Sequence, residues 1–184
     1  MIIASQKRKE NIAEYVLYMW QIEDTIRACH LDIDIIKSNI INRFSLDSER
    51  KMAMTEWYES LIDMMKREDI VAKGHLQIVK NTINNLADLH HKLLADTKFA
   101  EYGAEFYKTL PFIVELRSKA GENAVGELET CFTALYGVLM LRMQGKDVSE
   151  QTLAAVSHIS HFLALLSHYY KLDEEEKLFK NEDF

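Results

Sequence analysis

Proline and glycine are scarce in this chain, and their scarcity limits the folds that it can adopt. The 184 residues contain one proline and six glycines. A sheet-rich fold needs such residues in its many turns, and no segment alternates polar with apolar residues over the length of a strand. Apolar side chains instead recur every three or four residues, which is the spacing of one face of an α-helix. The sequence therefore predicts an all-α protein.

The periodic segments predict a helical bundle of about six to seven helices. In order, we expect a helix from about Ala4 to Cys29, a short helix capped by Asp32 and ending near Phe44, a third capped by Ser45 or Asp47, a fourth after Gly74 that reaches Leu93, a fifth from about Phe99 to Lys119, a sixth around Cys131–Leu141, and a last one capped by Ser149 that runs through Tyr170. The segment Cys131–Leu141 carries no charge, so we expect its helix in the centre of the bundle.

Pro111 lies in the middle of the fifth predicted helix. Because proline has no amide hydrogen, the carbonyl of Tyr107 loses its helical partner and the ring crowds the preceding turn. We expect a kink at Pro111, or two short helices instead of one. Gly121 can adopt the left-handed conformation that ends such a helix.

The composition indicates one domain. Apolar residues make up 48% of the chain and charged residues 28%, which is typical of a globular protein with a packed core. The sequence shows no internal repeat and no low-complexity linker. We predict a single helical-bundle domain over residues 1–172 and a frayed acidic tail over residues 173–184.

Charge and segment length exclude some classes of function. The net charge of −7 disfavours nucleic-acid binding, and the run Lys7–Lys9 is too short to offset it. No apolar segment is long enough to cross a membrane, and the charges near the start leave no room for a signal peptide. Cys29 and Cys131 lack metal-binding or redox spacing and are expected as core residues in a reducing compartment. We therefore predict a soluble, cytoplasmic protein.

Catalytic and metal-binding motifs are absent from the sequence. There is no phosphate-binding glycine loop, no nucleophile elbow, no paired cysteines and no Glu-x-x-His motif, so we predict no cofactor and no metal. Asp88 and His91 are interpreted as a surface pair. The stripe of His158, His161 and His168 on the last helix is most simply a polar face, and the alternative is a metal site or a pH-sensitive interface.

Two polar residues interrupt the apolar stripes of their helices and are the candidate binding residues. His90 occupies a core position of the fourth helix, and Glu23 occupies one in the first helix, with Arg27 one turn later as its expected partner. Satisfied polar contacts inside the bundle are the simpler interpretation. The alternative is a ligand pocket lined by both residues and by the neighbouring aromatic residues Tyr15, Tyr18, Trp20, Trp57 and Tyr58.

Five segments resemble a known protein family. They are MIIA at 1–4, KRKENIAEY at 7–15, YMWQIED at 18–24, LPFIVELR at 110–117 and ELETC at 127–131. They are similar to an uncharacterised bacterial all-helical family, domain of unknown function 4924, over essentially the whole chain. The resemblance supports a single domain and implies no activity, substrate or catalytic residue.

Two classes of function remain open at this point. The first is a non-catalytic helical-bundle interaction protein that self-associates, most simply as a homodimer, and that can bind a further partner or small ligand. The first helix carries large apolar residues in addition to those of a single apolar stripe. These are Leu17, Tyr18 and Trp20, and they are the candidates for a symmetric interface. The alternative is a small-molecule-binding protein or enzyme with a pocket between helices near His90 and Glu23. The sequence favours the non-catalytic class.

Overall fold

The computed structural model describes residues 2–123 and 125–178, and these residues form helices and connecting turns without a strand. The α-helices are α1 (Ile2–Glu10), α2 (Ile12–Ala28), α3 (Ile33–Asn39), α4 (Ser48–Arg67), α5 (Gln77–Ala95), α6 (Ala100–Ala120), α7 (Glu127–Met143) and α8 (Glu150–Glu174), and the short 3-10 helices are Ile41–Arg43, Thr97–Phe99 and Gly121–Asn123. The predicted all-α class is confirmed. The described residues contain eight α-helices instead of the six to seven expected.

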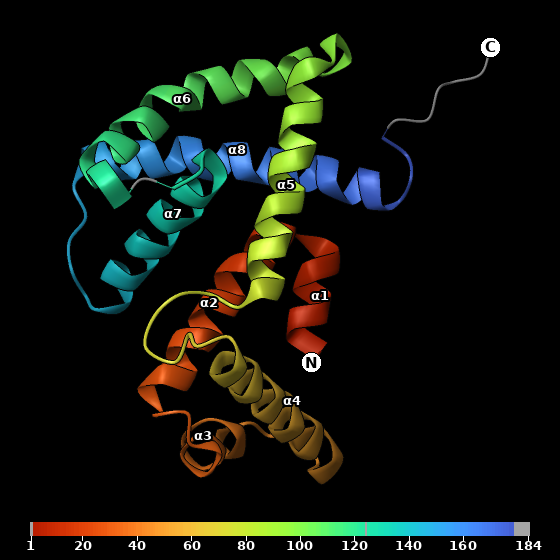
Figure 1. Ribbon diagram of the computed structural model, residues 1–184, viewed down its shortest axis with the longest axis vertical. Coiled ribbons are helices and arrows are strands. Elements are labelled where there is room, and N and C mark those ends of the chain that lie inside the picture. Colours follow the sequence, from red (N-terminus) through yellow and green to blue (C-terminus); the bar gives the residue numbers. More distant parts are fainter. Residues whose placement is uncertain (1, 124, 179–184) are drawn as a thin grey trace.

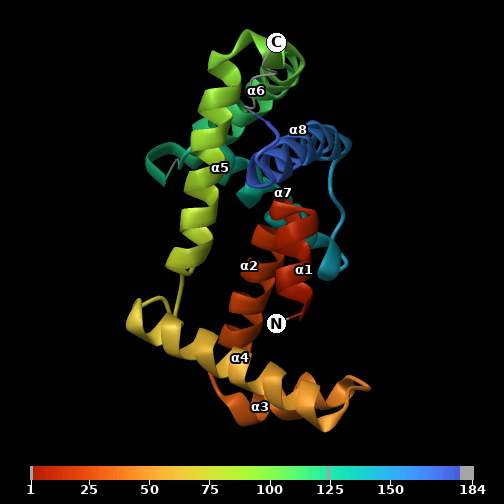
Figure 2. The same ribbon diagram turned by 90° about the vertical axis from the view of Figure 1, so that its right-hand side faces the viewer.

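α2 packs against α1, α4, α5, α7 and α8. α3 and α4 lie at the end of the molecule where α2 ends, and α6 lies at the opposite end (Figures 1 and 2). α8 packs against α6 and α7 and also reaches α2 and α5. The core is therefore continuous from one end of the molecule to the other.

The first predicted helix is two helices, because Asn11 interrupts it. Asn11 has extended backbone angles (φ −153°, ψ 104°), and its side chain accepts hydrogen bonds from the amides of Ala13 and Glu14 at 3.0 and 3.2 Å. Asparagine is a preferred N-cap because its short side chain reaches the unpaired amides of the first turn. The chain reverses at this residue, and α1 lies antiparallel against α2 (Figures 1 and 2).

The other predicted helix ends are largely confirmed. Asp32, Asp47 and Ser149 accept hydrogen bonds from amides in the first turns of α3, α4 and α8. Gly121 follows α6 with a positive φ of 57°. These positions could be read from the sequence because each involves a residue with a local capping preference.

α6 continues through Pro111 as one helix from Ala100 to Ala120, so the alternative of two short helices is wrong. Its ribbon is curved in Figure 1, in agreement with the expected distortion. Pro111 is exposed, on the side of α6 opposite the buried Phe106 and Ile113. Solvent can therefore reach the turn in which the proline removes a helical hydrogen bond.

The core takes large side chains from five helices. Those with the least exposed surface include Trp20, Tyr58, Tyr102, Phe132 and Phe162. Leu17 and Tyr18 are half-buried against the same core. Trp20 is therefore taken up by the core, whereas Leu17 and Tyr18 keep part of their surfaces exposed, and a symmetric interface at these two residues stays a prediction. Cys29 and Cys131 are buried free thiols, as expected.

The end of the chain differs in part from the expected tail. α8 includes Asp173 and Glu174, and the side chain of Leu178 is buried with 5% of its surface exposed. Residues 179–184 lie outside the described part of the chain. Among the described helices, none combines the length and the apolar character that crossing a membrane requires.

Replacing Asn11 by alanine is expected to lower the free energy of unfolding by about 1 kcal/mol, because α2 loses the acceptor for two of its first amides. Urea denaturation measures this change. Asn11→Asp is the matched control, since its carboxylate keeps the acceptor, and it should stay close to the original protein. Equal losses in both variants would show that the cap does not stabilise the junction of α1 and α2.

Candidate functional site

Glu23 of α2 is the most deeply buried acidic side chain among the described residues, with 0% of its surface exposed. Its Oε2 lies 2.6 Å from Nδ1 of His75, and its Oε1 accepts a hydrogen bond from the amide of Leu76 at 3.0 Å. An ionised carboxylate is stable in the interior only when donors replace the water that it loses. Both oxygens of Glu23 have such a partner.

The amides at the start of α5 are bound by carboxylates from elsewhere in the chain. Leu76, the N-cap residue, has no capping side chain of its own, and its amide donates to Glu23. The amide of Gln77 donates to Oε2 of Glu68, at the end of α4, at 2.7 Å. Because the first amides of a helix lack internal partners and carry positive partial charge, two carboxylates at this end stabilise α5.

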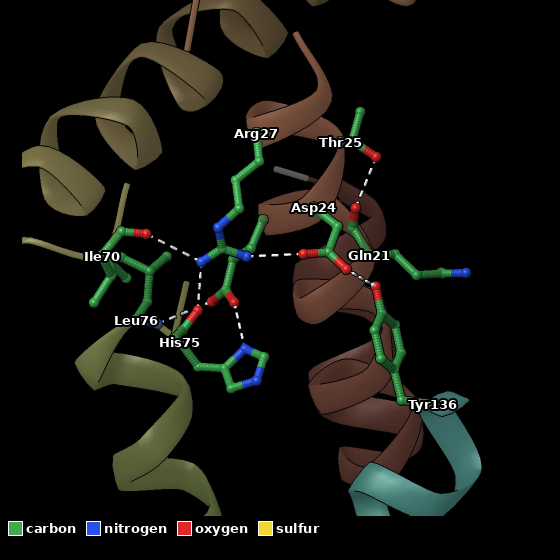
Figure 3. A network of polar contacts seen from close by, with 10 residues as sticks. Gln21, Asp24, Thr25, Arg27, Ile70, His75, Leu76 and Tyr136 are labelled. Carbon is green, nitrogen blue, oxygen red and sulfur yellow. Dashed lines mark hydrogen bonds and ion pairs between the residues drawn. The ribbon is translucent and has the colours of Figure 1, made fainter. Parts of the chain in front are cut away.

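Arg27 does not pair with Glu23, which corrects the expectation from the sequence. Its guanidinium contacts Oδ1 of Asp24 at 2.8 Å and donates to the carbonyl oxygens of Ile70, at 3.2 Å, and of Gly74. Figure 3 shows Arg27 between Asp24 and the carbonyl of Ile70. Gly74 has a φ of 96°, which strains any residue with a side chain. Arg27 thus holds the connection between α4 and α5.

Aromatic rings complete this arrangement. The ring of His75 stacks on Trp20 with centroids 4.1 Å apart and planes at 12°, and Tyr136 of α7 meets Trp20 edge-on at 5.5 Å. The hydroxyl of Tyr136 donates to Oδ2 of Asp24 at 2.6 Å (Figure 3). Burial, and then this hydrogen bond, raise the pKa of Tyr136. We call Trp20, Glu23, Asp24, Arg27, His75 and Tyr136 the Glu23 cluster.

The free nitrogen of His75 is the one group of the Glu23 cluster with the geometry of a reactive base. When Nδ1 donates to Glu23, Nε2 carries a lone pair, as in histidines that a carboxylate orients. His75 lines a cavity of about 170 Å³ together with Gln77, Lys80, Ile83, Asn84 and Glu129. These lining residues include no serine, threonine or cysteine that the imidazole could activate.

His90 lies far from the Glu23 cluster. It follows Leu76 by 14 residues in α5, which corresponds to about 21 Å along the helix axis. The pocket lined by both Glu23 and His90, which was the alternative interpretation of the sequence, is therefore not formed. Tyr15 and Trp57 line a separate cavity of about 170 Å³. Tyr58 is buried beside Trp57, and burial raises its pKa to about 12.

His90 is buried as a neutral imidazole. Its Nδ1 lies 2.6 Å from the hydroxyl of Tyr102, and its Nε2 lies 3.8 Å from Oε2 of Glu127 without a hydrogen-bond partner among the described residues. Burial, and then the charge of His91, lower the pKa of His90 to about 4. If Tyr102 donates to Nδ1, the N–H at Nε2 points toward the carboxylate of Glu127, which favours this tautomer.

The histidines of α8 do not share one environment. His158 stacks on Phe112 of α6 at 4.9 Å, and His168 contacts Tyr169. Within the described residues, no three His, Cys, Asp or Glu side chains gather as metal ligands. Asp88 and His91 are both exposed, in agreement with a surface pair.

His75, Asp24 and Tyr136 belong to the Glu23 cluster but were not predicted from the sequence. One sequence feature could have pointed to His75 and Leu76. The segment Lys73–Gln77 starts a helix without a serine, threonine, aspartate or asparagine at its N-cap. The caps must then come from elsewhere in the chain, and a buried glutamate on another helix is a candidate.

A protein-family model described as domain of unknown function DUF4924 matches residues 1–177. The chain belongs to this family. No curated protein and no solved structure matches the chain. The DUF4924 match covers every residue of the Glu23 cluster, and the family description assigns no role to them.

Glu23→Ala is expected to lower the free energy of unfolding by about 3 kcal/mol or more, because the amide of Leu76 and the imidazole of His75 lose a buried charged acceptor. Urea denaturation measures the loss. Glu14→Ala is the matched control on the same helix, since Glu14 is exposed and its ion pair with Lys7 contributes little. A loss no larger than that of the control would contradict a stabilising role for Glu23.

Acid is expected to destabilise the protein through His90. Its pKa in the folded state, about 4, is below the ordinary value of 6.5, so the unfolded chain binds the proton more readily. The free energy of unfolding that the neutral His90 contributes is fully present above about pH 6.5. It falls as the pH drops toward 4, by about 3 kcal/mol in all. The double variant His90→Leu/Tyr102→Phe should lose less stability between pH 7 and pH 4 than the original protein, whereas the exposed-site control His161→Leu on α8 should not differ from it. Denaturation midpoints across pH measure this, and parallel curves for the two variants would refute the role of His90.

Proposed function

We propose that this protein is a non-catalytic interaction protein whose helical bundle self-associates through the outward face of α6. One observation supports this proposal above all: a stripe of exposed, uncharged residues follows α6 along its full length. The stripe, which we call the α6 stripe, consists of Ala100, Ala104, Tyr107, Pro111, Val114 and Ser118. The claim that the protein is non-catalytic is supported by the Glu23 cluster, because its buried polar groups hold the connection between α4 and α5 in place.

The spacing of the α6 stripe is that of a helix seam. Its members alternate at four and three residues, which keeps them on one side of a helix that packs against another helix. The opposite side of α6 is buried within the chain by Tyr102, Phe106 and Ile113. In the α6 stripe, Tyr107 and Val114 keep 65% and 57% of their surfaces exposed. Large apolar side chains in an exposed row are typical of a contact surface.

The charges beside the α6 stripe favour a second copy of the chain as the partner. Lys108 and Glu115 are exposed on the same side of the stripe, three and four residues from Pro111 in opposite directions. If two copies of α6 pack antiparallel about a two-fold axis at Pro111, each Lys108 lies opposite Glu115 of the other copy. Tyr107 then lies opposite Val114. Such complementarity fixes the register of the contact, and apolar burial provides most of its affinity.

The interface that we propose is small. A stable interface buries about 1,200–2,000 Å² in total, and a single pair of curved helices provides only part of that area. We therefore expect a reversible homodimer with a dissociation constant in the micromolar range. Cys29 and Cys131 are buried free thiols, which supports a reducing compartment such as the cytoplasm as the place where the protein acts.

The double variant Tyr107→Glu/Val114→Glu is expected to be a monomer at concentrations where the original protein is a dimer, because four charges would meet in an apolar contact. Sedimentation velocity over a wide concentration range measures the change. The matched control is Met52→Glu/Met143→Glu, at two exposed methionines away from α6. A monomeric original protein at all concentrations, or a dimer that only the control disrupts, would overturn the proposal.

A further inference from the structure

A cleft lies between α6, α7 and the first half of α8, on a different side of α6 from the α6 stripe. Its volume is about 260 Å³. The lining residues are Phe112, Glu115, Leu116 and Lys119 of α6, Thr133, Ala134, Gly137, Val138 and Leu141 of α7, and Gln151, Thr152, Ala155, Val156 and Ile159 of α8. Most of these side chains are apolar. The uncharged segment Cys131–Leu141 of α7 was expected in the centre of the bundle. One side of it is instead open to this cleft, where Thr133 and Gly137 are exposed.

Gly137 is the residue of the cleft whose identity the rest of the chain does not explain. It lies in the interior of α7, where glycine is less favourable than alanine because it loses more backbone entropy. A Cβ atom at this position would meet nothing within 4 Å, and φ is not positive. Neither a close helix contact nor the backbone conformation therefore requires glycine here. What the missing side chain provides is space in the cleft.

The polarity of the cleft indicates the class of molecule that fits. Glu115 and Lys119 are the charged side chains in the lining, and they pair with each other at 2.6 Å. Thr133, Gln151 and Thr152 are its neutral polar side chains. The ring of Phe112 is fixed by stacking with His158, with planes at 19°. The cleft thus offers apolar walls, one oriented ring and neutral hydrogen-bonding groups, without an unpaired charge for an ion.

We propose that this cleft binds a neutral, largely apolar small molecule with one hydroxyl, carbonyl or amide group. The volume is below that of a typical drug-sized site, so the ligand is smaller than a drug-sized molecule. Its apolar part lies against Gly137, Val138 and Ile159, and its polar group bonds to the threonines or the glutamine. This proposal does not rest on self-association, because the lining of the cleft includes no residue of the α6 stripe; Glu115, which lies beside the stripe, belongs to the cleft wall as well.

The probe for the experiment is N-phenylnaphthylamine, a neutral dye whose fluorescence rises in apolar sites, with octanol as a competitor. The original protein is expected to bind the dye saturably at one site and to release it to octanol. Gly137→Leu fills the cleft and should weaken binding about tenfold or more. Gly137→Ala should weaken binding less and raise the thermal midpoint by a few degrees, because the helix gains a better residue.

Gly103→Ala is the matched control. Gly103 also lies inside a helix, and its added Cβ would make an ordinary contact of 3.9 Å with Leu94, away from the cleft. It should raise the thermal midpoint without changing dye binding. Ala155→Leu fills the cleft from α8 and provides a second test if Gly137→Leu does not fold. The monomeric variant Tyr107→Glu/Val114→Glu should bind the dye like the original protein, so that a failure of either proposal can be recognised separately.

Two results would overturn the ligand site. One is dye binding that does not saturate at one molecule per chain. The other is saturable binding that neither Gly137→Leu nor Ala155→Leu weakens, since the dye would then bind elsewhere. Loss of binding in the monomeric variant would also overturn the site as described, because the cleft would then have to be completed by a second copy.

Discussion

The buried carboxylate of Glu23 is the interaction on which the position of α5 depends. An ionised group without water is unstable unless donors surround it, so His75 and the amide of Leu76 must remain at 2.6 and 3.0 Å. These two residues directly precede α5, and α5 in turn packs against α6, α7 and α8. The need of the Glu23 carboxylate for these donors therefore constrains the position of α5 and, through it, of α6, α7 and α8.

The surroundings of Glu23 explain why apparently functional residues serve the fold instead. Arg27 donates to the carbonyls of the connection before α5 and pairs with Asp24, and Asp24 accepts the hydrogen bond from Tyr136 that links α7 to α2. Apolar packing alone would allow several arrangements of a turn with few side chains in the core, whereas directional hydrogen bonds select one. Polar groups that interrupt an apolar stripe are therefore not by themselves a sign of catalysis, and the outer surfaces carry the functional proposals.

Sequence periodicity was sufficient for the class of fold and for most helix ends, because both depend on residues close together in the chain. The break at Asn11 was missed since apolar spacing continues across it, and only the cap reveals the reversal. The partner of Glu23 was missed for a related reason. Arg27 is its neighbour by helical spacing, but the actual partners follow 52 and 53 residues later in the chain. Contacts between distant residues leave no periodic signal, so the burial of Glu23 and His90 could be predicted and their separation could not.

Pro111 and Gly137 break the local preferences of their helices without compensation inside the chain, and they lie on neighbouring surfaces of α6 and α7. A proline inside a helix costs about 3 kcal/mol and a glycine about 1 kcal/mol relative to alanine. Pro111 is exposed in the interior of α6, and the position of Gly137 is open to the cleft. At many other positions the local signals and the fold agree, as the caps at Asp32, Asp47 and Ser149 show. When most residues of a sequence suit the local structure that they adopt, the residues that do not suit it mark positions where requirements other than folding act. The end of the molecule formed by α6, α7 and α8 is therefore where an interaction partner and a ligand are best sought.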